Sequence, residues 1–187
     1  LGIGGIRIGN GSSDCAITNS AIHDISSSGI FIGNNTGHNH GYCDPGTDVT
    51  GVVVRNNYIT RTGLDIFGSS AICALYTSDT VIDHNEVCYT TYTGISLGWG
   101  WDWKNAPCSG NNTVSNNYIH DTGKTIHDGG SFYSLGLQEG TKVFGNYLHH
   151  HSDGLYDKDG GLYTDEGSTG LELYNNVVGD GVYWWQK

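Results

Sequence analysis

The chain has little positive charge. Its 187 residues include eight Lys or Arg residues against nineteen Asp or Glu residues, a formal net charge of −11. No block of Lys or Arg is present to displace the counterions of phosphates, which excludes nucleic acid as a partner. No run of about 18 apolar residues occurs, so we expect no membrane span. The chain opens in mid-pattern without a signal peptide or Met, and we interpret it as a mature or truncated piece.

Strong helix formers are also scarce. Glu, Lys, Ala and Gln are sparse, whereas Gly accounts for 30 residues and Asn, Thr, Ser and Tyr are abundant. This composition is typical of β structure. A chain of this length can bury the core of one domain, and we expect a single domain over residues 1–187.

The five cysteines show no C-x-x-C spacing, which argues against a zinc site of that type. Cys43 and Cys108 lie in turn-rich stretches, where we expect a disulfide bond. Cys73 and Cys88 lie in apolar runs, and we expect both to be buried.

A repeated segment is the main signal in the sequence. Its six copies are "ITNSAIHD", "VRNNYITR", "IDHNEVCY", "VSNNYIHD", "VFGNYLHH" and "LYNNVVGD". They align on Ser20, Asn57, Asn85, Asn117, Asn146 and Asn176, with steps of 37, 28, 32, 29 and 30 residues. A second apolar run follows each copy, as in "GIFIG", "AICAL", "GISLG", "SFYSL", "GLYTD" and "GVYWW". Each repeat is therefore predicted to be strand, turn, strand and loop.

The runs are too short for helices and carry apolar residues such as Val114, Ile119 and Phe132 at alternate positions, which excludes helical hairpins. We predict an all-β, right-handed parallel β-helix of about six coils. The alternative, a propeller, needs four strands in about 40 residues, more than the spacing allows. The Asn column is predicted to form a hydrogen-bonded ladder at one corner of the coils.

Capping repeats are not recognisable at either end of the sequence. We therefore interpret the chain as a fragment of the β-helix, whose uncapped coil ends expose unpaired strand edges. Either further chain covers these edges, or the ends associate with other copies.

The stretch "GGLYTDEGSTG" places two adjacent carboxylates, Asp165 and Glu166, at the end of a strand-like run. If Leu162 and Thr164 face the core, alternation turns Tyr163 and Asp165 outward. The same count places Tyr163 beside Tyr133 and Asp165 beside Leu135 of the preceding coil. The direction of Glu166 stays open, because the strand enters a turn there.

The stretch "GWGWDW" contains Trp99, Trp101 and Trp103 at alternate positions, so the three indoles share one face of a strand or extended loop. Exposed Trp faces offer flat apolar surface to sugar rings. We predict that these residues line the same outer groove as Asp128 and Asp165. The alternative is that all three pack beneath a long loop.

Several strings, taken in order, resemble one known family. They are "NEVCYTTYTGISLGWGWDW", "NNYIHDTGKTIHDGGSFYSLGLQEGT", "GNYLHH" and "GGLYTDEGSTGLELYNNVV", and the likeness covers roughly residues 50–180. This order resembles the central coils of right-handed β-helix glycosidases of glycoside hydrolase family 141, which includes α-L-fucosidases and xylanases. The resemblance implies catalytic carboxylates at Asp128 and Asp165. It also implies a secreted or periplasmic enzyme that hydrolyses a plant or algal polysaccharide or oligosaccharide. The His-rich "HHHSDGLYDKDG", the five cysteines and the short chain depart from the family.

Glycoside hydrolysis requires a protonated carboxyl group and a second carboxylate as base or nucleophile, and Asp128 and Asp165 supply such a pair. Tyr133 and Tyr163 are expected beside them, and His127 is expected to bind sugar hydroxyls, together with His120. If Asp165 is structural, Glu166 is the substitute. A separation of about 5.5 Å would give retention and about 6.5–9.5 Å inversion, a choice that the sequence leaves open.

No metal is predicted apart from a candidate calcium site near Asp157 and Asp159. The run His149 to His151 is a poor chelate if neighbouring residues on a strand point to opposite faces. Two other functions stay open. A polysaccharide lyase on the same fold would use calcium and a base such as Lys158. A non-catalytic carbohydrate-binding or structural β-helix would stack end to end.

Overall fold

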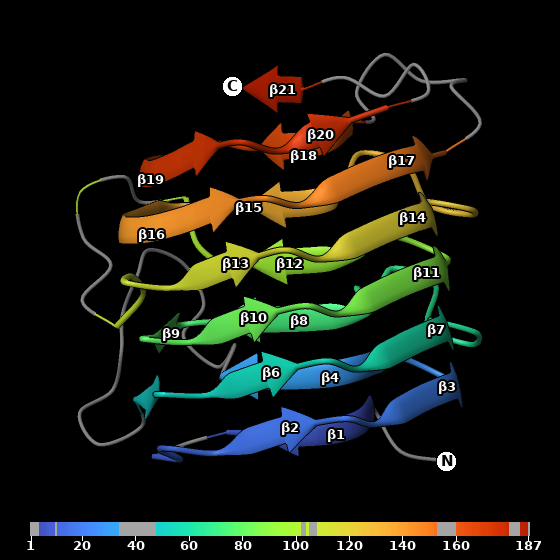
Figure 1. Cartoon of the computed structure of the whole chain (residues 1–187), viewed down its shortest axis with the longest axis horizontal. Helices are drawn as coiled ribbons and strands as arrows, with labels where there is room; N and C mark the ends of the chain where they lie inside the picture. The colour runs from blue at the N-terminus through green and yellow to red at the C-terminus, as the bar shows by residue number, and fades with distance from the viewer. Residues whose placement is uncertain are drawn as a thin grey trace.

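The computed structural model describes residues 4–9, 11–33, 48–101, 104, 108–152 and 160–179, and the backbone of 184–186. The described residues form strands and no helix, so none offers a helix that could cross a membrane. The strands stack as successive coils of one solenoid, with the N-terminus at one end and the C-terminus at the other (Figure 1). This architecture is the predicted parallel β-helix.

Three parallel sheets form the walls of the solenoid. Sheet 1 contains β1 (Gly4–Ile8), β4 (Ser28–Gly33), β8 (Ile72–Leu75), β12 (Ile95–Leu97), β15 (Gly130–Ser134), β18 (Gly160–Thr164) and β21 (Trp184–Gln186). Sheet 2 contains β2 (Ala16–Thr18), β6 (Val53–Arg55), β10 (Val81–Asp83), β13 (Thr113–Ser115), β16 (Leu137–Phe144) and β19 (Thr169–Tyr174). Sheet 3 contains β3 (Ala21–Ile25), β7 (Tyr58–Thr62), β11 (Glu86–Thr90), β14 (Tyr118–Thr122), β17 (Tyr147–His151) and β20 (Val177–Val178). A short pair, β5 (Val49–Thr50) and β9 (Thr77–Ser78), lies outside these walls.

Each repeat has three strands, and the prediction of two was wrong. The Asn-containing copy is divided by its corner, so that "VRNNYITR" provides both β6 and β7. The residue before the ladder Asn has a left-handed backbone, as at Asn56 (φ 56°) and Asn116 (φ 53°). Asn tolerates this conformation better than most residues, which explains why the corner sequence so often reads Asn-Asn.

The Asn ladder is confirmed by its hydrogen bonds. The side-chain Nδ2 of each Asn donates to the Oδ1 of the next, at 2.9 Å from Asn57 to Asn85, 3.0 Å from Asn85 to Asn117, and 2.9 Å from Asn117 to Asn146. The same oxygens also accept hydrogen bonds from the backbone. For example, the Asn85 N–H donates to Asn117 Oδ1 at 2.9 Å. The ladder therefore satisfies buried polar groups of the corner on every coil.

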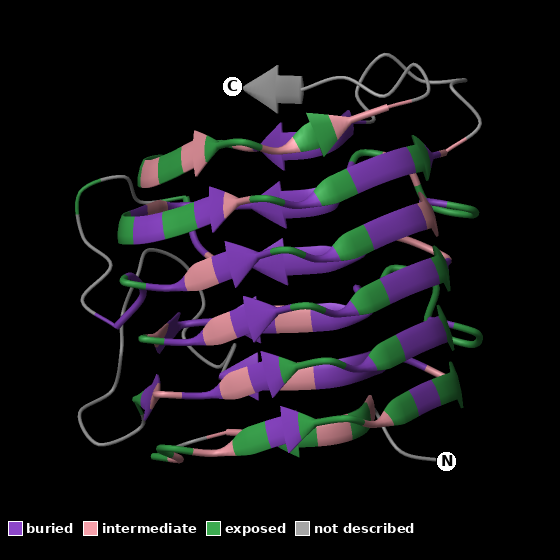
Figure 2. Cartoon of the chain, viewed as in Figure 1, coloured by how far each residue is buried: buried purple, intermediate pink, exposed green. Residues whose placement is uncertain are grey.

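Inward side chains stack in register to form the core. Ile59, Val87, Ile119 and Leu148 follow one another along sheet 3 and are fully buried. Burial of such a side chain stabilises the fold by about 1.5–3 kcal/mol. The middle coils are mostly buried along their strands, whereas the first and last coils carry more exposed positions (Figure 2). Val114, Ile119 and Phe132, which the sequence places at alternate positions of apolar runs, all lie in the core.

The cysteines follow the sequence prediction only in part. Cys108 is disulfide-bonded, and Cys43 lies outside the described residues. Cys88 is buried, but Cys73 is half-buried because it faces outward from sheet 1, between Phe31 and Ser96.

The prediction for the His run was wrong in its geometry. His150 has a left-handed backbone (φ 51°), which interrupts the alternation of β17. The Nδ1 atoms of His149 and His150 therefore lie 3.0 Å apart instead of on opposite faces. His151 turns inward, where its Nδ1 lies 2.7 Å from Thr122 Oγ1.

Candidate functional site

Two neighbouring strands of sheet 1 position the candidate carboxylates. Asp128 lies two residues before β15, and Asp165 directly follows β18. The register pairs Tyr133 of β15 with Tyr163 of β18, and Ser96 of β12 with Tyr133. This agrees with the predicted stacking, because residues paired in register point to the same side of a sheet. Tyr133, Tyr163 and Asp165 thus face outward from the solenoid, while Leu162 and Thr164 face the core.

Two crossed hydrogen bonds join the tyrosines to the carboxylates. The Tyr133 hydroxyl donates to Asp165 Oδ2 at 2.6 Å, and the Tyr163 hydroxyl donates to Asp128 Oδ1 at 2.9 Å. The two rings stack between these contacts, with centroids 5.4 Å apart and an interplanar angle of 24°. Each Tyr therefore connects its own coil to a carboxylate of the other coil. We call Asp128, Tyr133, Tyr163 and Asp165 the phenol–carboxylate cluster.

The phenols act as hydrogen-bond donors and not as ionised groups. Burial raises the pKa of Tyr133 well above its ordinary value, and the hydrogen bond to Asp165 raises it further. Burial and the hydrogen bond to Asp128 likewise raise the pKa of Tyr163, with a further contribution from the charge of Asp165. Both carboxylates thus favour the neutral form of the Tyr163 phenol.

Backbone contacts fix both carboxyl-bearing residues. Asp128 has a left-handed backbone (φ 65°), and its carbonyl accepts a hydrogen bond from the Tyr92 hydroxyl at 2.9 Å. The next residue, Gly129, packs closely against its neighbours, because a Cβ added there would lie 2.7 Å from Thr93 Oγ1. The Asp165 N–H donates to the Ser134 carbonyl at 2.9 Å. Neither acid thus depends on a long unsupported loop.

Glu166 and His127 occupy less central positions. Glu166 is exposed in the turn after β18, and its carbonyl accepts a hydrogen bond from the Gly136 N–H at 3.3 Å. The phenol hydroxyls donate to Asp128 and Asp165. His127 is half-buried beside Asp128.

His120, which we expected near Asp128, instead lies on β14 of sheet 3 beside Glu86.

Two of the three indoles lie on the same outer side as the cluster. Trp99 is half-buried and packs against the buried group formed by Tyr133, Leu135 and Tyr163, whereas Trp101 is 44% exposed. Their rings meet edge to face, with centroids 5.5 Å apart and an interplanar angle of 68°. The carbonyl of Trp101 would lie 3.1 Å from a Cβ added at Gly167, which places this segment against the turn after Asp165. Trp103 lies outside the described residues.

A groove of about 330 Å³ runs along the outer side of sheet 1 beside the cluster. Its lining includes Trp99, Trp101, Tyr92, Tyr133 and Ser96. Asp128 and Asp165 do not line it directly, but Tyr133 and Tyr92 connect the groove to the two acids. The arrangement combines flat aromatic surface with two carboxylates held at one side of it.

The possible calcium ligands Asp157 and Asp159, like Lys158, lie outside the described residues. Tyr92 is the residue of this site that the sequence analysis missed. It has no repeated counterpart in the other coils, so no sequence signal marks it.

Comparisons with known proteins agree with this fold. The chain matches the model of the right-handed β-helix region over residues 4–178 and belongs to that family. A solved structure named "Glycoside hydrolase" superposes with a TM-score of 0.84 at 30% sequence identity, over 98% of this chain and 34% of that one. The chain thus spans about a third of that protein's length. No curated protein sequence matches it. The fold is therefore that of a right-handed parallel β-helix similar to a glycoside hydrolase.

Proposed function

We propose that the chain carries the catalytic coils of a secreted or periplasmic glycoside hydrolase that acts on a plant or algal polysaccharide or oligosaccharide. The observation that supports this most directly is the phenol–carboxylate cluster. Its two carboxyl groups accept hydrogen bonds from the two phenols, and the cluster lies beside a Trp-lined groove. The neighbour named glycoside hydrolase adds support from the fold. A closer relation to family 141 is part of the proposal.

In this mechanism, Asp128 and Asp165 divide two roles between them. One carboxyl group protonates the leaving glycosidic oxygen, and the other activates water or attacks the anomeric carbon. The phenols hold one oxygen of each carboxyl group through the crossed hydrogen bonds, so that its other oxygen keeps a fixed direction. Trp99 and Trp101 offer apolar faces to sugar rings in the groove.

Replacement of either acid tests this function. Asp128→Asn and Asp165→Asn should each reduce the release of reducing sugar by about 10²–10⁴-fold, because a proton-transfer group or nucleophile is lost. The substrate is first found by screening a panel of plant and algal polysaccharides. The melting temperature should stay close to that of the parent chain, since the amide retains most of the hydrogen bonds.

Asp79→Asn is the matched control. Asp79 is an exposed carboxylate at a different corner of the solenoid, with a left-handed backbone that Asn also adopts. Its replacement should leave activity unchanged. Full activity in both test variants, or an equal loss in the control, would refute the proposed roles.

A further inference from the structure

Three side chains with metal-binding atoms meet on the outer face of sheet 3, away from the phenol–carboxylate cluster. Glu86 and Cys88 occupy alternate positions of β11, and His120 of β14 pairs in register with Cys88. Alternate residues of a strand share a face, and neighbouring strands lie about 4.8 Å apart. A carboxylate oxygen, the thiol sulfur and an imidazole nitrogen consequently lie within 4.8 Å of one another.

The imidazole of His120 is oriented toward the other two groups. Its Nδ1 lies 2.8 Å from Asp121 Oδ2, and Lys124 pairs with the other oxygen of Asp121 at 3.1 Å. With Nδ1 engaged, Nε2 is the nitrogen that faces Glu86 Oε1, at 3.4 Å. A carboxylate on the distal nitrogen of a His is the usual support of a metal-bound imidazole.

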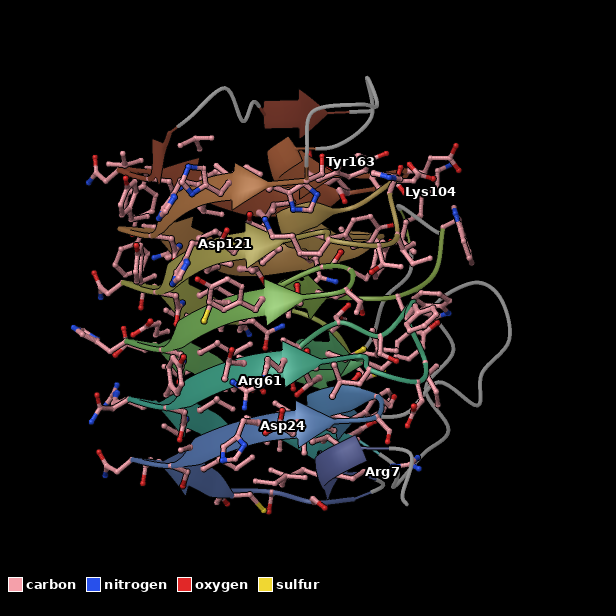
Figure 3. The ribbon with its side chains drawn as sticks, turned by 90° about the vertical axis from the view of Figure 1, so that its right-hand side faces the viewer. Arg7, Asp24, Arg61, Lys104, Asp121 and Tyr163 are labelled. Carbon is pink, nitrogen blue, oxygen red and sulfur yellow. The ribbon has the colours of Figure 1, made fainter. Side chains whose placement is uncertain are left out.

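Ring stacking restrains His120 further. Its ring lies against Tyr118, with centroids 4.3 Å apart, and parallel to His149, at 5.3 Å. In Figure 3 the outer face of sheet 3 is turned to the viewer, with Asp121 labelled on it. The imidazole is thus held in place before any ligand arrives, which lowers the conformational entropy lost on binding.

We propose that Glu86, Cys88 and His120 bind one zinc ion. Zinc accepts sulfur, nitrogen and oxygen ligands in tetrahedral geometry, whereas calcium and magnesium select oxygen. Three protein ligands leave a fourth position for water. Cys88 and His120 are buried, while Glu86 is exposed, so an ion from solvent reaches the site along the carboxylate.

The proposed ion would join two coils of the solenoid. Glu86 and Cys88 belong to β11, and His120 to the next strand, β14, so one ion cross-links residues separated by 32 or 34 positions. A ligand that binds only the folded state raises its stability by mass action. Zinc should therefore raise the melting temperature of the chain.

Cobalt is the spectroscopic probe for this site. Titration of the 187-residue chain with Co²⁺ should produce a thiolate-to-metal charge-transfer band and the visible bands of tetrahedral cobalt, saturating at one equivalent. Addition of Zn²⁺ should remove them. Cys88→Ser should abolish the charge-transfer band, and Asp121→Asn should weaken Zn²⁺ binding by about 10–100-fold through the loss of His120 orientation.

Cys73→Ser is the matched control, because Cys73 is also a free cysteine that faces outward from a strand. Circular dichroism without metal shows whether each variant is folded. If Cys88→Ser does not fold, His120→Gln serves as a second ligand variant. The proposal fails if the folded parent chain shows no thiolate band. It also fails if the band persists in Cys88→Ser or disappears in Cys73→Ser.

Discussion

At the scale of single residues, the two phenols show how a site depends on groups that do not themselves react. Tyr133 and Tyr163 are buried, stacked on each other and hydrogen-bonded to acids on opposite coils. Sequence alternation predicted that Tyr163 would lie beside Tyr133. It could not predict the crossed contacts, because Asp128 lies before β15, where no periodic pattern determines the direction of a side chain.

Removal of one phenol hydroxyl should impair the site while preserving the fold. Tyr133→Phe keeps the stacked ring but leaves Asp165 Oδ2 without its donor at 2.6 Å. We expect a loss of about 1–3 kcal/mol in unfolding free energy, since a part-buried hydrogen bond to a carboxyl group is lost, together with reduced turnover. Chemical denaturation and the sugar-release assay measure the two effects. Tyr147→Phe, an exposed Tyr on sheet 3, is the control, and equal losses in both variants would contradict a special role for Tyr133.

Asp83 provides a prediction for the dependence of stability on pH. Burial acts to raise its pKa, but hydrogen bonds from Ser115, His84 and Asn116 outweigh it and lower the pKa to about 2, from an ordinary value of 3.8. A lowered pKa in the folded state stabilises the fold above about pH 4, and this contribution is lost as the pH falls toward 2.

Asp83→Asn should remove that contribution. At neutral pH we expect a loss of about 1–2 kcal/mol in unfolding free energy, after allowance for solvent screening. The difference between the parent chain and the variant should shrink as the pH is lowered through 4 to 2. Urea unfolding at several pH values measures it, and a difference that does not change with pH would contradict this role of Asp83.

At the scale of elements, the Asn corner explains which parts of the fold could be predicted. One residue type recurs at one position of every coil after the first, so both the ladder and the stacking order follow from the sequence. The division of each copy into two strands does not, because the left-handed residue before the Asn has no fixed identity: it is Asn56, His84 or Gly145 in different coils. His150 also has a left-handed backbone, which no fixed residue type marks in the sequence, so alternation gave the wrong direction for the His side chains.

Loss of an inner Asn should be more damaging than loss of the last one. Asn117 is buried, donates to Asn146 Oδ1 and to the Ile82 carbonyl, and accepts from Asn85. Asn117→Ala should cost about 2–4 kcal/mol, because several buried groups lose their partners. Asn176→Ala, at the half-buried end of the ladder, should cost about half as much. Equal effects in urea unfolding would show that the ladder bonds are not what stabilises the corner.

The cluster of Glu86, Cys88 and His120 is another element-scale feature that the sequence concealed. The lack of C-x-x-C spacing excludes only a zinc site whose cysteines lie close together in the chain. In a parallel β-helix, register brings together residues about one repeat apart, here Cys88 and His120. A search for ligands at the repeat spacing, in place of C-x-x-C spacing, would have found them.

At the scale of the whole molecule, each sheet of the described solenoid ends in a strand with only one partner. These edge strands include β2 and β3 at one end and β19 and β20 at the other. Unpaired strand edges favour pairing with another chain, while a net charge of −11 opposes the approach of two copies.

We therefore predict that the 187-residue chain self-associates more strongly as ionic strength rises. Added salt shortens the Debye length from about 30 Å at 0.01 M to about 8 Å at 0.15 M and so weakens the repulsion between molecules of like net charge. Sedimentation velocity at a series of protein concentrations, at low and moderate salt, measures this. A chain that stays monomeric at all concentrations in both buffers would contradict association through the coil ends.

The Asn ladder has a consequence for how such chains change during evolution. Each ladder Asn is separated from the next by between 28 and 32 residues, yet the side-chain hydrogen bond across that interval keeps nearly the same length. Any coil bounded by two of these residues presents the same junction above and below. Recombination that exchanges one such coil for another of different length would preserve the frame and replace only the loops, including those beside the aromatic groove.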